Sequence, residues 1–301
     1  MNRISTNQWY RQGVDNMLHN QARLSRTQLQ LATGQRLLAP SDDPGDASRA
    51  LQLDQLIADV AQYQRNADRA DSRLVREEKV LESAGNIFQR VRELAVQGLN
   101  DSYSAQDRRA MAQEVRENLE ALLAQANERD SNGEYLFSGY RSGTIPFVET
   151  TPGVFEYQGD QGQRLLRIGA ARHVATNDPG DAVFMNIDDG AGGRTNAFAI
   201  LHDLAQDLEA DTLSDQVLTR IDNAMDRLST VRSRIGSRLQ AIDNQRGIND
   251  SFKLLMEEDR SNLRDLDYAE AVSRMQQQML MLQASQQSFM KVEGLSLFNY
   301  F

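Results

Sequence analysis

Residues 268–289 read YAEAVSRMQQQMLMLQASQQSF, and their apolar positions recur at alternating steps of four and three. This seven-residue repeat gives a helix one continuous seam for partner helices. Residues 275–290 carry no charge but contain six glutamines, and a bilayer core would reject that many amides. We therefore expect a helix that packs on other helices and does not cross a membrane. Its predicted assembly seam consists of Tyr268, Val272, Met275, Met279, Leu282 and Phe289, with Gln286 in the same pattern.

A matching seam lies near the other end of the chain. Two isolated helices bury too little apolar surface to be stable alone in water. Glutamine on a seam suits a larger assembly, in which amides pair across several helices. We therefore expect the end helices to order fully only when subunits assemble, although an intramolecular helical hairpin is an alternative. This second predicted seam consists of Val14, Met17, Leu24, Leu31 and Leu38, with Gln21, Gln28 and Gln35 between them.

Composition narrows the class of protein. A chain of 301 residues has room for two or three domains. The net charge of −10, without any basic tract, argues against nucleic acid or an anionic membrane as the main partner. The absence of cysteine excludes disulfides, thiol catalysis and cysteine metal sites. Residues 1–20 contain no apolar run of seven and no cleavage motif, so we expect no secretory signal peptide.

Proline and glycine divide the chain into helical ends around an irregular middle. Residues 45–145 and 180–301 contain no proline, whereas 11 of the 19 glycines lie between Gly133 and Gly193. We predict a mainly α fold, a long-helix bundle or coiled coil from both chain ends with a small β-rich insert. The predicted domains are a terminal helical assembly domain (1–42 plus 264–301), a helical core domain (43–139 plus 196–263) and a small β-rich outer domain (140–195). Its short strands are expected at 145–148, 154–157, 164–168 and 172–175.

Local signals place the helix boundaries. We expect the first helix to end near Gly34, and residues 39–46, APSDDPGD, to separate it from the second. Asp43 suits an N-cap and Pro44 the first helical position, so Pro40, Asp43 and Pro44 are predicted to form a hinge.

A change of heptad phase before Tyr268 predicts a corresponding break at the other end. A capping box at Ser104–Asp107 is expected to begin a third helix, which Asn132-Gly133 should end.

The sequence contains no set of residues typical of a catalytic or metal-binding site. His19, His173 and His202 lie far apart, and none has a second ligand at helical spacing, so we expect no metal site. The sequence also does not indicate a nucleophile, a base and an orienting residue that could form a catalytic set. We therefore interpret the chain as a protein that is not an enzyme and needs no cofactor.

Three segments, in order along the chain, resemble the bacterial flagellin superfamily. They are LATGQRLLAPSDDP at 31–44, QRVRELAVQ at 89–97 and DYAEAV at 267–272. The likeness covers about 1–140 and 195–301. Within the superfamily, ASRALQL at 47–53 and LSLFNYF at 295–301 are more similar to the hook-associated branch than to the filament subunits.

This resemblance implies a structural protein of the bacterial flagellum that joins the hook to the filament and templates flagellin assembly. It implies a homo-oligomer whose partners are another hook-associated protein, flagellin and an export chaperone that binds the C-terminal region. It also implies an extracellular place in the flagellum, reached through the flagellar type III apparatus without a cleaved signal peptide. The alternatives are a flagellin-type filament subunit and, from a different class, a cytoplasmic coiled-coil scaffold.

Overall fold

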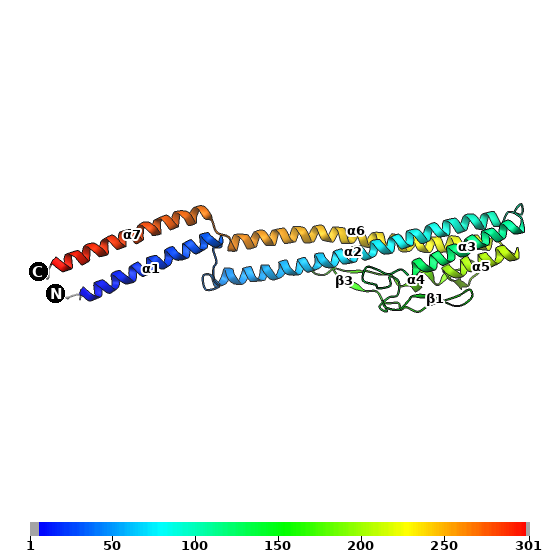
Figure 1. Cartoon of the computed structure of the whole chain (residues 1–301), viewed down its shortest axis with the longest axis horizontal. Helices are drawn as coiled ribbons and strands as arrows, with labels where there is room; N and C mark the ends of the chain where they lie inside the picture. Colours follow the sequence, from blue (N-terminus) through cyan, green and yellow to red (C-terminus); the bar gives the residue numbers. More distant parts are fainter. Residues whose placement is uncertain (1–5, 299–301) are drawn as a thin grey trace. The chain divides into compact units, whose positions relative to one another are not determined.

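The computed structural model describes residues 6–298 and is mainly helical, which confirms the predicted fold class (Figure 1). No helix in this described part of the chain is long and apolar enough to cross a membrane. The helices are α1 (Thr6–Thr33), α2 (Pro44–Gly98), α3 (Ala105–Ala126), the short α4 (Gly180–Phe184), α5 (Ala197–Ala210), α6 (Gln216–Arg264) and α7 (Tyr268–Phe298).

The insert contains three separate antiparallel hairpins. They are β1 (Phe147–Thr151) with β2 (Val154–Tyr157), β3 (Leu165–Arg167) with β4 (His173–Ala175), and β5 (Ile187–Asp188) with β6 (Arg194–Thr195). The first two hairpins confirm the four strands expected from the sequence. The third hairpin and α4 were not predicted, because strands of two residues are too short to show an alternating pattern.

Side-chain caps form where the sequence predicted them. The Asp43 carboxylate accepts hydrogen bonds from the backbone N–H groups of Gly45 and Asp46, both at 3.0 Å, and Pro44 takes the first position of α2. Ser104 and Asp107 form both hydrogen bonds of a capping box at the start of α3. These local interactions fix where each helix begins.

The expected end of α3 at Asn132-Gly133 is wrong, because the helix ends at Ala126. The Asn127 side chain accepts a hydrogen bond from the Phe147 N–H at 3.0 Å and donates one to the Phe147 carbonyl oxygen at 2.9 Å. The Asn127 side chain therefore joins the end of α3 to the start of β1. Gly133 has a φ of 80° and lies in a later turn.

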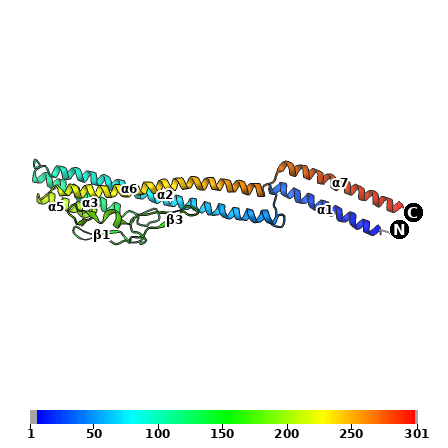
Figure 2. The same cartoon turned by 180° about the vertical axis from the view of Figure 1, so that it is seen from behind.

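The chain divides into two compact units, which are described separately. We call residues 60–251 the core unit and residues 1–59 with 252–301 the end unit. The core unit holds the main hydrophobic core, in which α3 lies beside α5 (Figures 1 and 2). The Phe147 ring lies 5.0 Å from the Phe198 ring and 5.5 Å from the Phe184 ring, so aromatic packing attaches the insert to α5.

The end unit has almost no core. Helices α1 and α7 lie side by side and run antiparallel within it (Figures 1 and 2). Among the end-unit residues whose burial the structure describes, only Ala50, Met256, Leu266 and Ala271 are buried apolar residues. Burial of apolar side chains is the main stabilising contribution to folding. The end unit buries few of them, so it gains little stability from its own packing. The three predicted domains, with boundaries at 42 and 264 and at 140 and 195, stay a proposal.

Candidate assembly surface

Helices α1 and α7 are neighbours, and their half-buried and buried side chains include two rows on each helix that repeat every seven residues. One row on each helix is large and apolar. The second row is made of small or amide-bearing residues. The large row consists of Met17, Leu24 and Leu31 on α1 and of Met275, Leu282 and Phe289 on α7, and the small row of Gly13, Asn20 and Thr27 on α1 and of Ala271, Gln278 and Ser285 on α7.

The small row lets the two helices approach closely. A Cβ atom at Gly13 would lie 3.0 Å from the Phe289 ring, which is closer than an ordinary contact. The same Phe289 ring lies 5.2 Å from the ring of Tyr10. Further along, the Asn20 amide donates a hydrogen bond to the Ser285 hydroxyl oxygen at 3.2 Å. The sequence reading missed this row, whose signal is a small or amide residue at every seventh position.

The structure brings only part of the predicted seam together. All six residues of the large row belong to it, and Val14 is half-buried beside them. Tyr268, Val272 and Met279 are instead exposed, and Val272 and Met279 lie on the flank of α7 next to the packing rows. We call Val272, Met279 and the equally exposed Gln286, which repeat every seven residues, the flank row. The part that these residues play in assembly stays a prediction.

Leu38 lies beyond the end of α1, in the linker to α2. It is half-buried and lines a shallow apolar hollow of the end unit together with Pro40, Ala47 and Leu51. Leu38 therefore does not extend the helical seam, although it lines the same hollow as Ala47 and Leu51 of α2.

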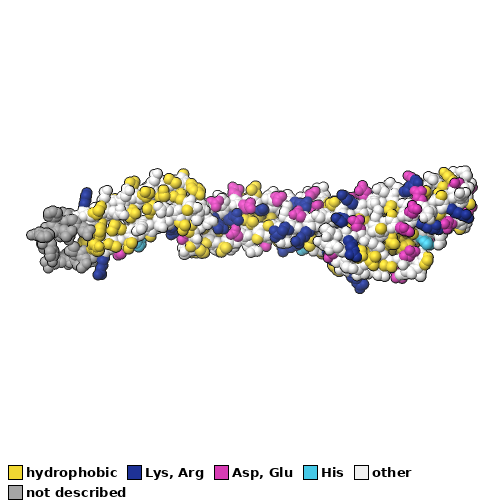
Figure 3. Space-filling model, in the orientation of Figure 1, with side chains coloured by type: hydrophobic (Ala, Val, Ile, Leu, Met, Phe, Trp, Pro, Cys, Tyr) yellow, Lys and Arg dark blue, Asp and Glu magenta, His cyan; other side chains and the backbone are white. Residues whose placement is uncertain are grey.

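The end unit exposes many large apolar side chains besides the flank row. Figure 3 shows hydrophobic side chains gathered over α1 and α7, with few charges between them. A contiguous exposed apolar surface of this kind marks a site of protein interaction. Besides Tyr268 and the flank row, the exposed large apolar residues of the end unit are Trp9, Tyr10, Leu18 and Leu29 on α1, Leu51 and Leu56 on α2, Phe252, Leu254 and Leu255 on α6, and Leu280, Met281 and Met290 on α7.

The two linkers of the end unit are hydrogen-bonded to each other. Gln35 and Asp265 form an antiparallel bridge, and the Leu266 N–H donates to the Gly34 carbonyl oxygen at 3.0 Å. The Arg36 guanidinium contacts the Asp46 carboxylate at 2.5 Å and donates to the Leu263 carbonyl oxygen at 2.6 Å. Arg36 thus connects the start of α2 to the end of α6. No pattern in the sequence predicts this role, because Leu263 is distant from Arg36 along the chain.

The predicted hinge residues lie in the first linker and at the start of α2. The Asp42 carboxylate accepts hydrogen bonds from the Leu38 N–H at 3.0 Å and the Ala39 N–H at 3.2 Å, and it pairs with Arg26 at 2.6 Å. The Leu38 hydrogen bond is the main cause that lowers the pKa of Asp42 below its ordinary value. An ionised Asp42 therefore holds the turn that contains Pro40. Movement about Pro40, Asp43 and Pro44 stays a prediction.

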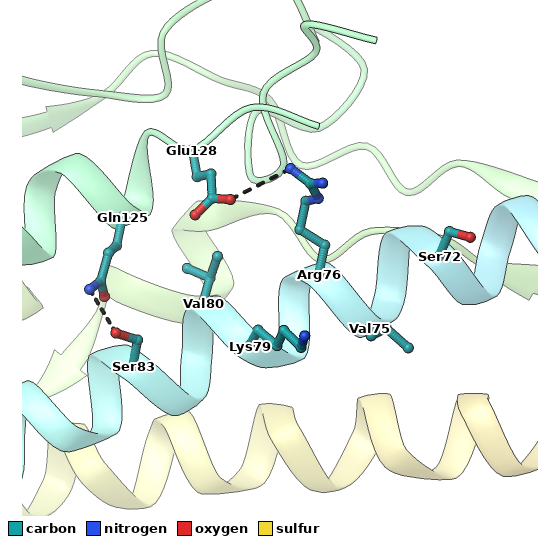
Figure 4. Close-up of a pocket in the computed structure, with 8 residues that line it drawn as sticks. All are labelled: Ser72, Val75, Arg76, Lys79, Val80, Ser83, Gln125 and Glu128. Carbon is teal, nitrogen blue, oxygen red and sulfur yellow. Dashed lines mark hydrogen bonds and ion pairs between the residues drawn. The ribbon is translucent and has the colours of Figure 1, made fainter. Parts of the chain in front are cut away.

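The core unit has a hollow that is lined mainly by polar side chains. It lies between α2 and the end of α3, where Gln125 donates a hydrogen bond to the Ser83 hydroxyl oxygen at 2.7 Å and Arg76 lies 3.7 Å from Glu128 (Figure 4). The residues that line it include no histidine or cysteine. Across residues 6–298, no group of three or more His, Cys, Asp or Glu side chains is placed to hold a metal ion.

Comparisons with known proteins match both helical ends of the chain. Residues 4–142 match the bacterial flagellin N-terminal helical region, and residues 218–301 match the bacterial flagellin C-terminal helical region. Flagellar hook-associated protein 3 of Escherichia coli K12 is 30% identical over 315 residues, which cover 98% of both chains. The phase 1 flagellin of Salmonella naestved is also 30% identical, but only over 45% of this chain and 27% of that protein.

A solved structure shares the fold. The crystal structure of flagellar hook-associated protein-3 from Legionella pneumophila aligns with a TM-score of 0.68 and 23% sequence identity. The alignment covers 70% of this chain and 98% of that one.

Proposed function

Since the chain belongs to the family of flagellar hook-associated protein 3, within the bacterial flagellin superfamily, we propose that it joins the flagellar hook to the filament as a structural protein. The observation that carries this proposal is the end-to-end match to a hook-associated protein, whereas the alignment with the phase 1 flagellin of Salmonella naestved covers 45% of this chain. The exposed apolar surface of the end unit supports it, because a subunit that assembles needs such a surface.

In this proposal the end units of neighbouring copies pack together. A head-to-tail contact between identical subunits propagates a ring or a helix. The large row stays between α1 and α7 of one subunit, and the flank row then meets helices of another. Fully burying a large apolar side chain contributes about 1.5–3 kcal/mol relative to leaving it exposed. Burial of such side chains therefore contributes to the stability of the assembled state.

The partners follow from this place in the flagellum. The proposed contacts are copies of the same chain, another hook-associated protein on the hook side and flagellin on the filament side. The assembled ring then templates flagellin. We also propose export through the flagellar type III apparatus, with a chaperone at the C-terminal region, and an extracellular final location. Residues 299–301 of the motif at 295–301 lie outside the described residues. The protein acts by holding its partners together, so the proposal includes no catalytic step.

Deletion of the gene in its motile source tests the proposal. We expect hooks without filaments, and intact flagellin shed into the culture medium, as seen by electron microscopy and by immunoblotting of the medium. Loss of flagellin itself would identify the chain as a filament subunit. Unchanged motility would favour the cytoplasmic scaffold.

A further inference from the structure

We propose that Met279, Met281 and Met290 form an oxidation site on α7, and that peroxide converts them to sulfoxides that prevent the free subunit from assembling. This inference rests on the proposed function, because it concerns the apolar surface that assembly would bury. It adds a chemical modification and the class of reagent that produces it.

Three methionines on α7 are accessible to an oxidant. Met279, Met281 and Met290 are 43%, 55% and 62% exposed, and they are the only exposed methionines among those whose burial the structure describes. Met111 on α3 and Met256 on α6 are only 8% and 6% exposed. Oxidation of a thioether depends on access of the oxidant to sulfur. Reaction with peroxide should therefore begin on α7.

The reaction needs no group beyond the side chain and the oxidant. The methionine sulfur attacks one oxygen of hydrogen peroxide, the sulfur–oxygen bond forms and the oxygen–oxygen bond breaks. Water leaves after proton transfer, so the thioether is oxidised by two electrons and the peroxide is reduced by two. The product replaces a flexible apolar side chain with a polar sulfoxide.

The exposed position of these methionines determines how their oxidation affects folding and assembly. In the free chain Met279, Met281 and Met290 are exposed, so a sulfoxide at these positions removes little packing between α1 and α7. In an assembly the same sulfoxides would be buried in an apolar contact, where an unpaired polar group is costly. Oxidation should therefore leave the subunit folded and block its addition to the hook.

The test uses the purified full-length chain and hooks isolated from a strain that lacks its gene. The protein is treated with hydrogen peroxide, the reaction is stopped, and each methionine is assigned by peptide mass spectrometry. We expect Met279, Met281 and Met290 to oxidise several-fold faster than Met111, which is buried in the core unit. Treated protein should keep its helical circular dichroism but lose most of its co-sedimentation with hooks.

Two variants serve as controls. The triple variant Met279→Leu, Met281→Leu and Met290→Leu keeps apolar volume but lacks the oxidisable sulfurs. Whatever its level of co-sedimentation with hooks before treatment, peroxide should not lower that level. The buried control Met111→Leu, in the core unit, should stay as sensitive as the wild type. Equal binding of treated and untreated wild-type protein would overturn the inference, as would equal loss in the triple variant. Untreated protein that fails to bind hooks would instead count against the proposed function.

Discussion

Glu77 is a glutamic acid that the core unit buries almost completely on α2. One of its oxygens accepts a hydrogen bond from the Asp178 N–H at 3.0 Å, and the other has no partner. Burial is the main cause that raises the pKa of Glu77 well above its ordinary value, and the nearby Asp178 carboxylate adds to it. Arg73 and Arg238 oppose this shift, and Arg238 is itself paired with Asp178 at 2.8 Å.

The raised pKa of Glu77 predicts a pH-dependent stability. The stability contributed by the neutral acid is fully present below about pH 4.5, the ordinary pKa, and it is lost as the pH rises through the higher folded-state pKa. Glu77→Gln stays neutral, so its free energy of unfolding should increase relative to that of the wild type as the pH rises. Urea unfolding at pH 5, 7 and 9 measures the difference.

Glu78→Gln provides the matched control for this prediction. Glu78 is the next residue on α2, but it is only half-buried and pairs with Arg232 at 2.6 Å. It therefore gives the baseline for removing one carboxylate from the same helix. A difference between Glu77→Gln and the wild type that shrinks with rising pH would contradict the assignment of a neutral buried acid.

Gly34 ends α1 with a φ of 71°, in the left-handed region. Alanine there costs roughly 1–2 kcal/mol in backbone conformation, and its Cβ would lie 2.9 Å from the Tyr268 hydroxyl oxygen. We expect Gly34→Ala to speed hydrogen exchange in the last turns of α1. Gly133→Ala has the same backbone cost, at a φ of 80° with no atom within 4 Å, and should leave α1 unchanged. Unchanged exchange in both variants would refute the capping role of Gly34.

At the scale of elements, α7 presents two different faces. Its large row packs on α1, whereas its flank row is exposed. A helix with apolar residues on more than one face suits an assembly of several helices better than an isolated pair. The two faces should therefore respond differently to the same substitution.

Leu282→Asp and Met279→Asp test the two faces of α7. Leu282→Asp places a charge between α1 and α7, so we expect faster hydrogen exchange in both helices, an intact core unit and no binding to isolated hooks. Met279→Asp places the charge on the exposed flank, so exchange should stay as in the wild type while hook binding is lost. Normal hook binding by Met279→Asp would remove the flank row from the assembly surface.

At the scale of the whole molecule, apolar burial is concentrated in the core unit. Dilute monomer should therefore be cut by trypsin first in residues 1–59 and 252–301, leaving a fragment that includes residues 60–251, because local opening is easiest where few apolar contacts are lost. Mass spectrometry of a digestion time course identifies the cuts. The rate of cleavage can be compared after four exposed or half-buried arginines, which are Arg36 and Arg264 in the end unit and Arg92 and Arg116 in the core unit. Equal cleavage at all four, or protection of residues 1–40 and 265–301, would contradict the prediction.

The sequence by itself determined the helical plan and the family. Proline positions, the caps at Asp43 and Ser104 and the heptad repeats depend on residues close together in the chain, so their consequences could be derived without a tertiary fold. The tertiary structure decided which row of α7 meets α1, because that choice depends on how closely Gly13 and Ser285 let two helices approach. It also decided where α3 ends and that Glu77 is buried. Both depend on residues distant in sequence, Phe147 in one case and Asp178 in the other, and a linear pattern carries no information about such contacts.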